Sequence, residues 1–321
     1  MITERWEIIM RRKVIIDTDP GIDDAVAIGL ALFDETIEIV LMTTVSGNVS
    51  LAHTTNNILK LQRFWNKKIP VAMGAEQPIL REAINASEVH GESGMDGYDF
   101  PEANHDLLLE NNAVEAMYQA LVASQEKLTI VAIGPLTNIG LLLRLHPTIV
   151  NKIEELIIMG GAINRGNVGV YSEFNIASDP EAARIVFTST VPKVLVPLEI
   201  GHQSRIMPKE SLLLKEMNQT GEMIHGLFQR YRGGSFETGI EMYDVCAIAY
   251  LLQREMFEVT SCFVGIEVAG TYTSGATIVD LANVLDAPSN CKVCVTINQN
   301  RFKEWFFAAV NRCSTSSEST H

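Results

Sequence analysis

Short apolar runs alternate with longer segments that have a helical pattern along most of this chain. Five runs are typical of strands buried on both faces, at residues 14–16, 39–42, 129–133, 156–159 and 194–196. Helices are predicted between and after them, at residues 24–33, 50–65, 112–124, 136–145 and 180–187. This alternation predicts an α/β fold built on an open, mostly parallel sheet with helices on both faces. Functional loops are then expected at the carboxyl ends of the strands.

The last third of the chain has a different pattern. Residues 263–268 and 291–297 read as two further strands, and the turn-rich stretch 270–290 between them favours an antiparallel pair at the sheet edge. Residues 207–239 are expected to form a small helical cap or flap. No linker divides the chain, so we predict one domain over residues 14–313, a lead-in over residues 1–13 and a tail over residues 314–321.

Composition narrows the classes of function. The chain has 321 residues, 47% of them hydrophobic, which is enough for a large core. Its net charge of −14 would repel a phosphate backbone, which argues against a nucleic-acid partner. The uncharged windows are broken by polar residues, so no membrane association is expected. Five cysteines are few and odd in number, and the lead-in lacks an apolar signal region, which together predict a cytoplasmic protein.

A dense group of carboxylates follows the first predicted strand. Asp17, Asp19, Asp23 and Asp24 lie within eight residues, with Pro20-Gly21 forming a turn between the two pairs. Carboxylates packed this closely repel one another unless a cation neutralises them. Oxygen ligands without histidine or cysteine favour calcium or magnesium over zinc. The alternative is a helix N-terminus with exposed acidic residues.

A second polar group lies before the helix predicted to begin at residue 180. Asn167, Glu173 and Asn175 could accept and donate hydrogen bonds to the hydroxyls of a sugar, and would leave a buried acceptor unpaired with a deoxyribose. The alternative is that these residues cap helices.

The order of these segments resembles the nucleoside hydrolase family, the inosine–uridine-preferring enzymes that cleave ribonucleosides into ribose and a free base. The match is strongest with the bacterial branch of broad base specificity. The segments that carry the resemblance are residues 17–24, 46–48, 90–94, 133–138, 159–161, 167–182 and 242–247.

The resemblance implies a calcium-dependent hydrolysis of the N-glycosidic bond to ribose and a purine or pyrimidine. By similarity, the calcium ligands would be Asp19, Asp24, Asp244 and the backbone carbonyl of Ile133, with a water completing the shell. Asp19 would take the proton of that metal-bound water as general base, and Asn48 would orient the water. Asp17 would support the site from behind. The family also implies a homodimer or homotetramer.

The resemblance likewise assigns the residues that bind the nucleoside. The 2′- and 3′-hydroxyls would be bound by Asp23, Asn175 and Asp244, and the 5′-hydroxyl by Asn167 and Glu173.

Three residues are candidates at the base end of the site. Tyr243 stands where the family commonly has histidine, and a tyrosine with its ordinary pKa of about 10 is the weaker acid. Either Tyr243 donates a proton to the leaving base, or the enzyme relies on activation of the sugar alone. His90 would back Tyr243, or would simply hydrogen-bond within its glycine-rich loop. Tyr231 would stack on the base from a mobile flap, or would belong to an ordinary amphipathic helix.

Two other functions stay open from the sequence. A phosphohydrolase of the haloacid dehalogenase type also places an Asp-x-Asp pair after its first strand, although the extra acids Asp23 and Asp24 would repel phosphate. A calcium-dependent nucleoside-binding protein with little turnover would keep the same pocket.

Overall fold

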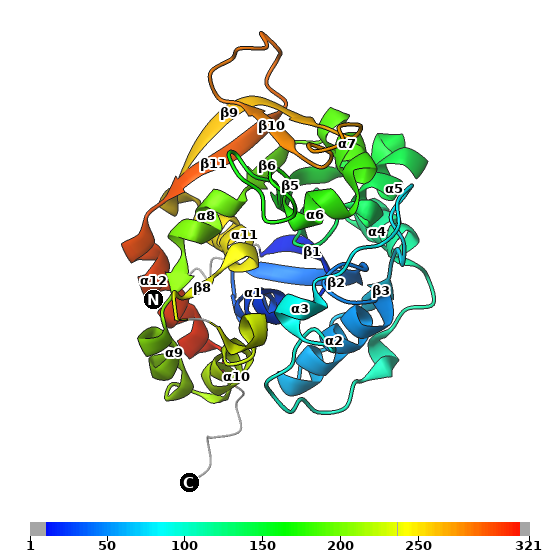
Figure 1. Cartoon of the computed structure of the whole chain (residues 1–321). Helices are drawn as coiled ribbons and strands as arrows, with labels where there is room; N and C mark the ends of the chain where they lie inside the picture. The colour runs from blue at the N-terminus through cyan, green and yellow to red at the C-terminus, as the bar shows by residue number, and fades with distance from the viewer. Residues whose placement is uncertain (1–10, 236, 315–321) are drawn as a thin grey trace, which may run out of the picture.

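The computed structural model describes residues 11–235 and 237–314, and its centre is one nine-stranded sheet (Figure 1). The strand order is β10-β9-β11-β6-β5-β4-β1-β2-β3. Pairing is parallel from β11 to β3, while β9 runs antiparallel to both β11 and β10. The predicted open, mostly parallel sheet is therefore confirmed. The strands of this sheet are β1 (Arg12–Thr18), β2 (Ile37–Thr44), β3 (Val71–Met73), β4 (Leu128–Ala132), β5 (Ile153–Met159), β6 (Lys193–Val196), β9 (Phe257–Ile266), β10 (Thr277–Asp280) and β11 (Cys291–Ile297).

Helices cover both faces of the sheet, and each of the five predicted helices is present. The α-helices are α1 (Ile22–Leu32), α2 (Leu51–Phe64), α3 (Ser87–His90), α4 (Ala113–Ala123), α5 (Thr137–Leu145), α6 (Phe174–Ser178), α7 (Pro180–Thr188), α8 (Leu198–Gln203), α9 (Pro208–Lys215), α10 (Gln219–Phe228), α11 (Tyr243–Leu252) and α12 (Gln299–Arg312). Short 3₁₀ turns are η1 (His105–Leu107), η2 (Pro147–Lys152), η3 (Tyr231–Gly234) and η4 (Arg254–Met256).

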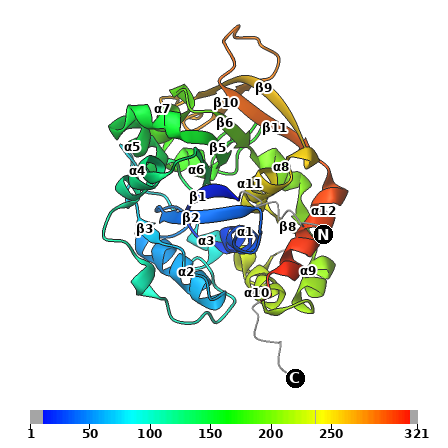
Figure 2. The ribbon, with the colours of Figure 1, turned by 180° about the vertical axis from the view of Figure 1, so that it is seen from behind.

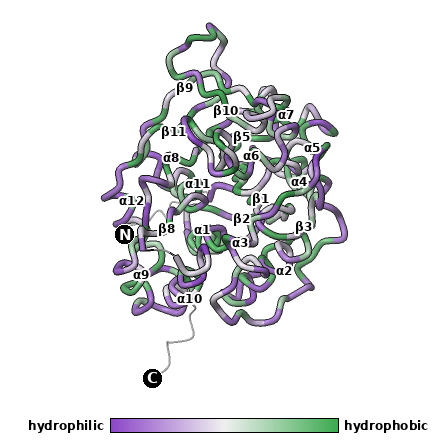
Figure 3. Tube along the Cα trace, viewed as in Figure 1, coloured by the Kyte–Doolittle hydropathy of each residue, from purple (hydrophilic) through white to green (hydrophobic). Residues whose placement is uncertain are grey.

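Alternation of side chains along the strands creates two hydrophobic cores. In β1, Val14 and Ile16 face the core formed with α1, α2, α10, α11 and α12, whereas Ile15 faces the core formed with α4, α5 and α7. Figure 2 shows these two groups of helices on opposite sides of the sheet. Figure 3 shows that α1, inside the fold, is largely hydrophobic, whereas α9 and α12 on the outside carry hydrophilic stretches. Burial on both faces explains why these strands are continuous apolar runs.

The edge of the sheet confirms the expected antiparallel pair and adds a strand to it. The strand predicted at residues 263–268 is the second half of β9, and β10 lies inside the stretch predicted to be turns. The cap expected at residues 207–239 contains α9, α10 and η3. Next to it, a two-stranded antiparallel sheet joins β7 (Arg205–Ile206) to β8 (Ile240–Glu241).

The chain ends lie partly outside the described residues. β1 begins at Arg12, inside the expected lead-in, and the rest of that lead-in up to residue 10 is not described. The expected tail is described only at residue 314. Among the described helices, none combines the length and the apolar character that crossing a membrane requires.

Candidate functional site

The predicted site residues gather at the carboxyl ends of neighbouring parallel strands. Asp19 follows β1, Asn48 follows β2, Ile133 follows β4 and Met159 ends β5. A cavity of about 460 Å³ opens there, which we call the site cavity. Ten of the predicted residues line it: Asp23, Asn48, His90, Ile133, Asn167, Glu173, Asn175, Tyr231, Tyr243 and Asp244. Asp19 and Asp24 lie fully buried and are not part of its lining. A larger cavity of about 670 Å³, beside α2 and Arg230, contains none of the predicted residues.

Three carboxylates converge at the N-terminal ends of α1 and α11. Asp23, Asp24 and Asp244 each place one carboxylate oxygen within 4.8 Å of the others. This trio contains Asp23 in place of the predicted Asp19. Burial and the charges of Asp23, Asp24 and Asp19 raise the pKa of Asp244 well above its ordinary value. Burial and the charge of Asp24 likewise raise the pKa of Asp23 to about 7.

Hydrogen bonds show which carboxylate oxygens of Asp24 and Asp19 have a partner in the protein. Asp24 accepts from the Thr18 hydroxyl at 2.6 Å, the Gly21 amide at 2.9 Å and the Asn48 side-chain amide at 3.1 Å. Asp19 Oδ2 accepts from the Asn48 backbone amide at 2.7 Å. Asp19 Oδ1 is fully buried and has no partner.

This free oxygen provides a test of whether the site suits a cation. An unpaired carboxylate oxygen buried in protein is costly unless it has a ligand. Here it belongs to a group of four buried carboxylates, Asp19, Asp23, Asp24 and Asp244, whose pKa values are all raised, first of all by burial. An all-oxygen set of this charge fits a hard divalent cation. The alternative of exposed acidic residues at a helix N-terminus is wrong, because Asp17, Asp19, Asp23 and Asp24 are all buried.

Asp17 belongs to β1, and its side chain is bound by residues of β2 and α5. Its Oδ1 accepts from the Thr43 hydroxyl at 2.5 Å and from the Asn138 side chain at 2.8 Å, while its Oδ2 has no partner. Burial raises its pKa to about 6.

The second polar group lines the site cavity beside α6. Glu173 accepts from the backbone amides of Gly161, Asn175 and Ile176, and Asn167 Oδ1 accepts from the amide of Phe174. The helix-capping interpretation is thus confirmed for Glu173. Capping still leaves both side chains in the cavity lining, and burial raises the pKa of Glu173 to about 7.

Asn175 connects this group to the predicted carbonyl ligand. Its side-chain amide donates to the carbonyl oxygens of Ile133 at 3.2 Å and Met159 at 3.3 Å. Because only the nitrogen of the side-chain amide can donate, these two bonds orient the Asn175 nitrogen toward both carbonyls.

His90 and Tyr231 stand together at another part of the cavity wall. Their rings meet edge to face with centroids 6.0 Å apart. His90 Nδ1 accepts from the Ile22 amide at 3.1 Å, which fixes the ring at the start of α1. Burial and the charge of Arg232 lower the pKa of His90 to about 4, so the ring is neutral near pH 7.

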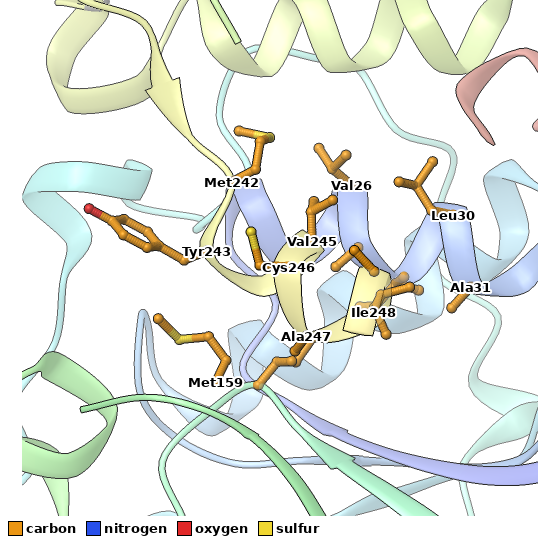
Figure 4. Close-up of a cluster of buried hydrophobic side chains, with 14 of the residues drawn as sticks. Val26, Leu30, Ala31, Met159, Met242, Tyr243, Val245, Cys246, Ala247 and Ile248 are labelled. Atoms are coloured by element: carbon orange, nitrogen blue, oxygen red, sulfur yellow. The ribbon is translucent and has the colours of Figure 1, made fainter. Parts of the chain in front are cut away.

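Tyr243 begins α11, is buried at the border of the core and lines the site cavity. In Figure 4 its ring points away from Val245 and Ile248. Its hydroxyl donates to Glu241 Oε2 at 2.9 Å, so its proton is directed at that carboxylate. Burial and the Glu241 charge raise the pKa of Tyr243 far above its ordinary value.

Sequence reasoning missed two residues of this region, Glu241 and Arg232. Glu241 Oε1 accepts from Arg205 at 2.6 Å and lies 3.2 Å from His202 Nδ1, and its pKa falls to about 2 despite burial because of these partners. Arg232 Nη2 lies 3.7 Å from Glu241 Oε2. Of the two, only Glu241 had a signal in the sequence, because it is a charged residue in an otherwise apolar stretch next to Tyr243.

Comparisons with known proteins agree with this geometry. A profile described as "Inosine-uridine preferring nucleoside hydrolase" matches residues 14–304. The chain is 47% identical over 296 residues to the Non-specific ribonucleoside hydrolase RihC of Escherichia coli strain SMS-3-5, covering 92% of this chain and 97% of that protein. RihC of Escherichia fergusonii is also 47% identical and is covered over its full length.

Solved structures give the same result. The Purine-Preferring Ribonucleoside Hydrolase from Gardnerella vaginalis superposes with a TM-score of 0.86 at 25% identity, covering 94% of this chain and 99% of that one. An Inosine-Guanosine Nucleoside Hydrolase gives a TM-score of 0.87 at 29% identity, covering 94% and 98%. These matches decide against the phosphohydrolase alternative, and they confirm the predicted resemblance. The chain belongs to the inosine-uridine preferring nucleoside hydrolase family and is a nucleoside N-ribohydrolase.

Proposed function

We propose that this enzyme uses calcium to hydrolyse the N-glycosidic bond of a broad range of ribonucleosides, releasing ribose and a purine or pyrimidine. One observation carries the proposal. The unpaired Asp19 Oδ1 is buried with three further carboxylates, Asp23, Asp24 and Asp244. Two of these, Asp23 and Asp244, line a cavity that Asn167, Glu173 and Asn175 also line. The broad range follows the name of the RihC relatives, Non-specific ribonucleoside hydrolase.

The residues divide the work of binding the sugar. Asp23, Asn175 and Asp244 would accept from or donate to the 2′- and 3′-hydroxyls, and Asn167 and Glu173 would bind the 5′-hydroxyl. The net negative charge of this wall favours the positive charge that develops on the ribosyl ring as the bond to the base breaks. These contacts also hold the anomeric carbon in one orientation.

Asp19 would be the general base. The Asn48 amide takes one of the lone-pair sites of Asp19 Oδ2, and Oδ1 has no partner. An ionised carboxylate has about four such sites, so Asp19 has room both to contact a cation and to accept a proton. As the water oxygen bonds to the anomeric carbon, a proton of the water passes to Asp19. The electron pair of the N-glycosidic bond leaves with the base. A cation held by Asp19, Asp24, Asp244 and the Ile133 carbonyl would orient the water and the ribose diol and acidify the water.

The test measures free base released from inosine, adenosine, uridine and cytidine, with calcium and after chelation. We expect turnover of all four with calcium and none after chelation. Asp19→Asn should lower kcat at least about a hundredfold, as expected for loss of a general base. Asp34→Asn is the matched control, because Asp34 lies outside the cavity lining and pairs with Arg312.

Two results would contradict the proposal. Full turnover by protein shown to contain no metal would exclude the cation. Tight binding of nucleosides without release of base would instead support the nucleoside-binding alternative. The predicted homodimer or homotetramer and the cytoplasmic location belong to this proposal and are tested by light scattering and cell fractionation.

A further inference from the structure

Among the described residues that line the site cavity, one side chain carries a positive charge near pH 7. Of the cavity-lining residues within the described ranges, only Arg232 is a lysine or arginine. The other ionisable groups of the lining are Asp23, Glu88, His90, Glu173, Tyr231, Tyr243 and Asp244. A guanidinium in a wall otherwise rich in carboxylates is suited to a partner that is negatively charged only during the reaction.

The backbone around Arg232 is built to present it. Arg232 has φ 48° and ψ 44°, a left-handed conformation that is unusual for a residue with a side chain. Such backbone conformations cluster at functional sites. The guanidinium lies over the Tyr231 ring, 5.3 Å from its centroid, so this ring limits its position on one side.

Glu241 limits the position of Arg232 on the other side. Its Oε2 lies 3.7 Å from Arg232 Nη2 and 2.9 Å from the Tyr243 hydroxyl, so both cavity-lining groups meet at one carboxylate oxygen. Glu241 itself is buried and does not line the cavity. Arg205 occupies the other oxygen, Oε1, at 2.6 Å. Glu241 is thus bound from several sides and is a firm anchor for Arg232.

The reaction needs a group at the base end of the cavity. When the N-glycosidic bond breaks, the electron pair moves onto the base and spreads over its ring nitrogens and carbonyl oxygens. His90 Nδ1 is already occupied by the Ile22 amide, and the Tyr243 proton is directed at Glu241. The Tyr243 proton is therefore not offered to the departing base. His90, neutral near pH 7 with its proton on Nε2, can donate a hydrogen bond there but brings no positive charge to the base. Arg232 has five N–H groups, and the contacts in the structure do not occupy all of them.

We propose that Arg232 is the catalytic residue that stabilises the departing base, and that Glu241 is its positioning residue. Arg232 donates a hydrogen bond to a ring nitrogen or carbonyl oxygen of the base as its negative charge grows. The guanidinium keeps its proton, and water protonates the base after the bond has broken. This inference rests on the proposed nucleoside hydrolysis and adds the group that activates the leaving base.

The experiment compares leaving groups that need this help with one that does not. Arg232→Gln and Arg232→Lys are assayed with inosine, with uridine and with nitrophenyl riboside, whose leaving group is stable as an anion. Arg232→Gln should lower kcat for inosine and uridine by about a hundredfold, the usual loss for one preorganised donor, and should change the nitrophenyl riboside rate less than about threefold. Arg232→Lys should recover part of the loss because it restores the charge without the planar fork.

Further arms separate catalysis from structure. Guanidinium ion added to Arg232→Ala should restore inosine turnover more than nitrophenyl riboside turnover. Glu241→Gln should show the same leaving-group dependence in weaker form, which a purely structural role would not produce. Arg254→Gln is the control, since Arg254 also pairs with a buried glutamate, Glu155, but lies outside the cavity lining.

The outcomes distinguish this inference from the proposed function. If the parent enzyme releases base from no riboside, the proposed function fails. If the parent is active but Arg232→Gln slows inosine and nitrophenyl riboside equally, or slows neither, Arg232 does not stabilise the leaving base and the inference is overturned.

Discussion

Removing the cation should change how the stability of this enzyme depends on pH. Burial and the Asp24 charge raise the pKa of Asp23 from 3.8 to about 7 when no cation is present. A carboxylate whose pKa is raised by folding stabilises the folded state while it is protonated, and this stability is lost as the pH rises through about 7. Chelated protein should therefore become more stable as the pH falls from about 8.5 to about 6.5, the opposite of ordinary acid denaturation.

The size of the effect follows from the pKa values. Protonation of Asp23 raises the free energy of unfolding by about 0.8 kcal/mol as the pH falls from about 8.5 to about 6.5. Glu173, whose pKa is also raised by burial to about 7, contributes a similar amount. Asp19 and Asp244 act in the same direction, since burial raises their pKa values as well. His90, whose pKa is lowered to about 4, opposes the gain by about 0.4 kcal/mol at about pH 6.5, because half of the unfolded form is protonated there. The total of at least about 1.2 kcal/mol corresponds to a Tm higher by about 2 °C for a chain of this length.

The assay is a set of thermal melts at the two pH values, with a chelator and with saturating calcium. Calcium competes with protons for the carboxylates, so it should remove the contribution of the aspartates and leave that of Glu173. Calcium should accordingly raise Tm more at the higher pH. Asp23→Asn is the control, because it removes one repelling carboxylate and should stabilise the chelated protein at the higher pH. A calcium effect of equal size at both pH values would refute this reasoning.

Three other predictions address the sugar, the base end and the core. 2′-Deoxyinosine should be cleaved with a kcat/KM at least about a hundredfold below that of inosine, because buried diol-binding groups would be left unpaired; similar values for both would contradict the sugar-binding assignment. Gly201→Ala would place a Cβ 2.1 Å from Tyr243 Cδ1, so it should lower turnover of inosine, and an unchanged rate would show that the ring position is unimportant. Thr220→Val removes the acceptor of the buried Trp65 indole N–H, at 2.9 Å, and should lower the free energy of unfolding by about 1–3 kcal/mol, measured by urea denaturation, with kcat unchanged.

The order of strands and helices was predictable from the sequence because it depends on local patterns. A strand covered on both faces must be apolar throughout, and a helix on one face must repeat its apolar positions with the helical period. The carboxylates of residues 17–24 were equally visible, since repulsion between neighbours in the chain does not depend on the rest of the fold. The exchange of Asp19 for Asp23 in the close trio of carboxylates was not visible, because it depends on where α11 places Asp244.

The tertiary structure alone decided which atoms of the site are free and which are occupied. Asn48, from the loop after β2, takes one oxygen of Asp19 and leaves the other unpaired. Glu241, in a two-residue strand beside the cap, accepts the hydrogen bond of the Tyr243 hydroxyl and lies next to Arg232. Hydrogen bonds are short and directional, so a donor and an acceptor from distant segments pair only after helices and strands have packed. Residue type and spacing therefore predicted which residues form the site, whereas the hydrogen-bond partner of each side chain depended on packing.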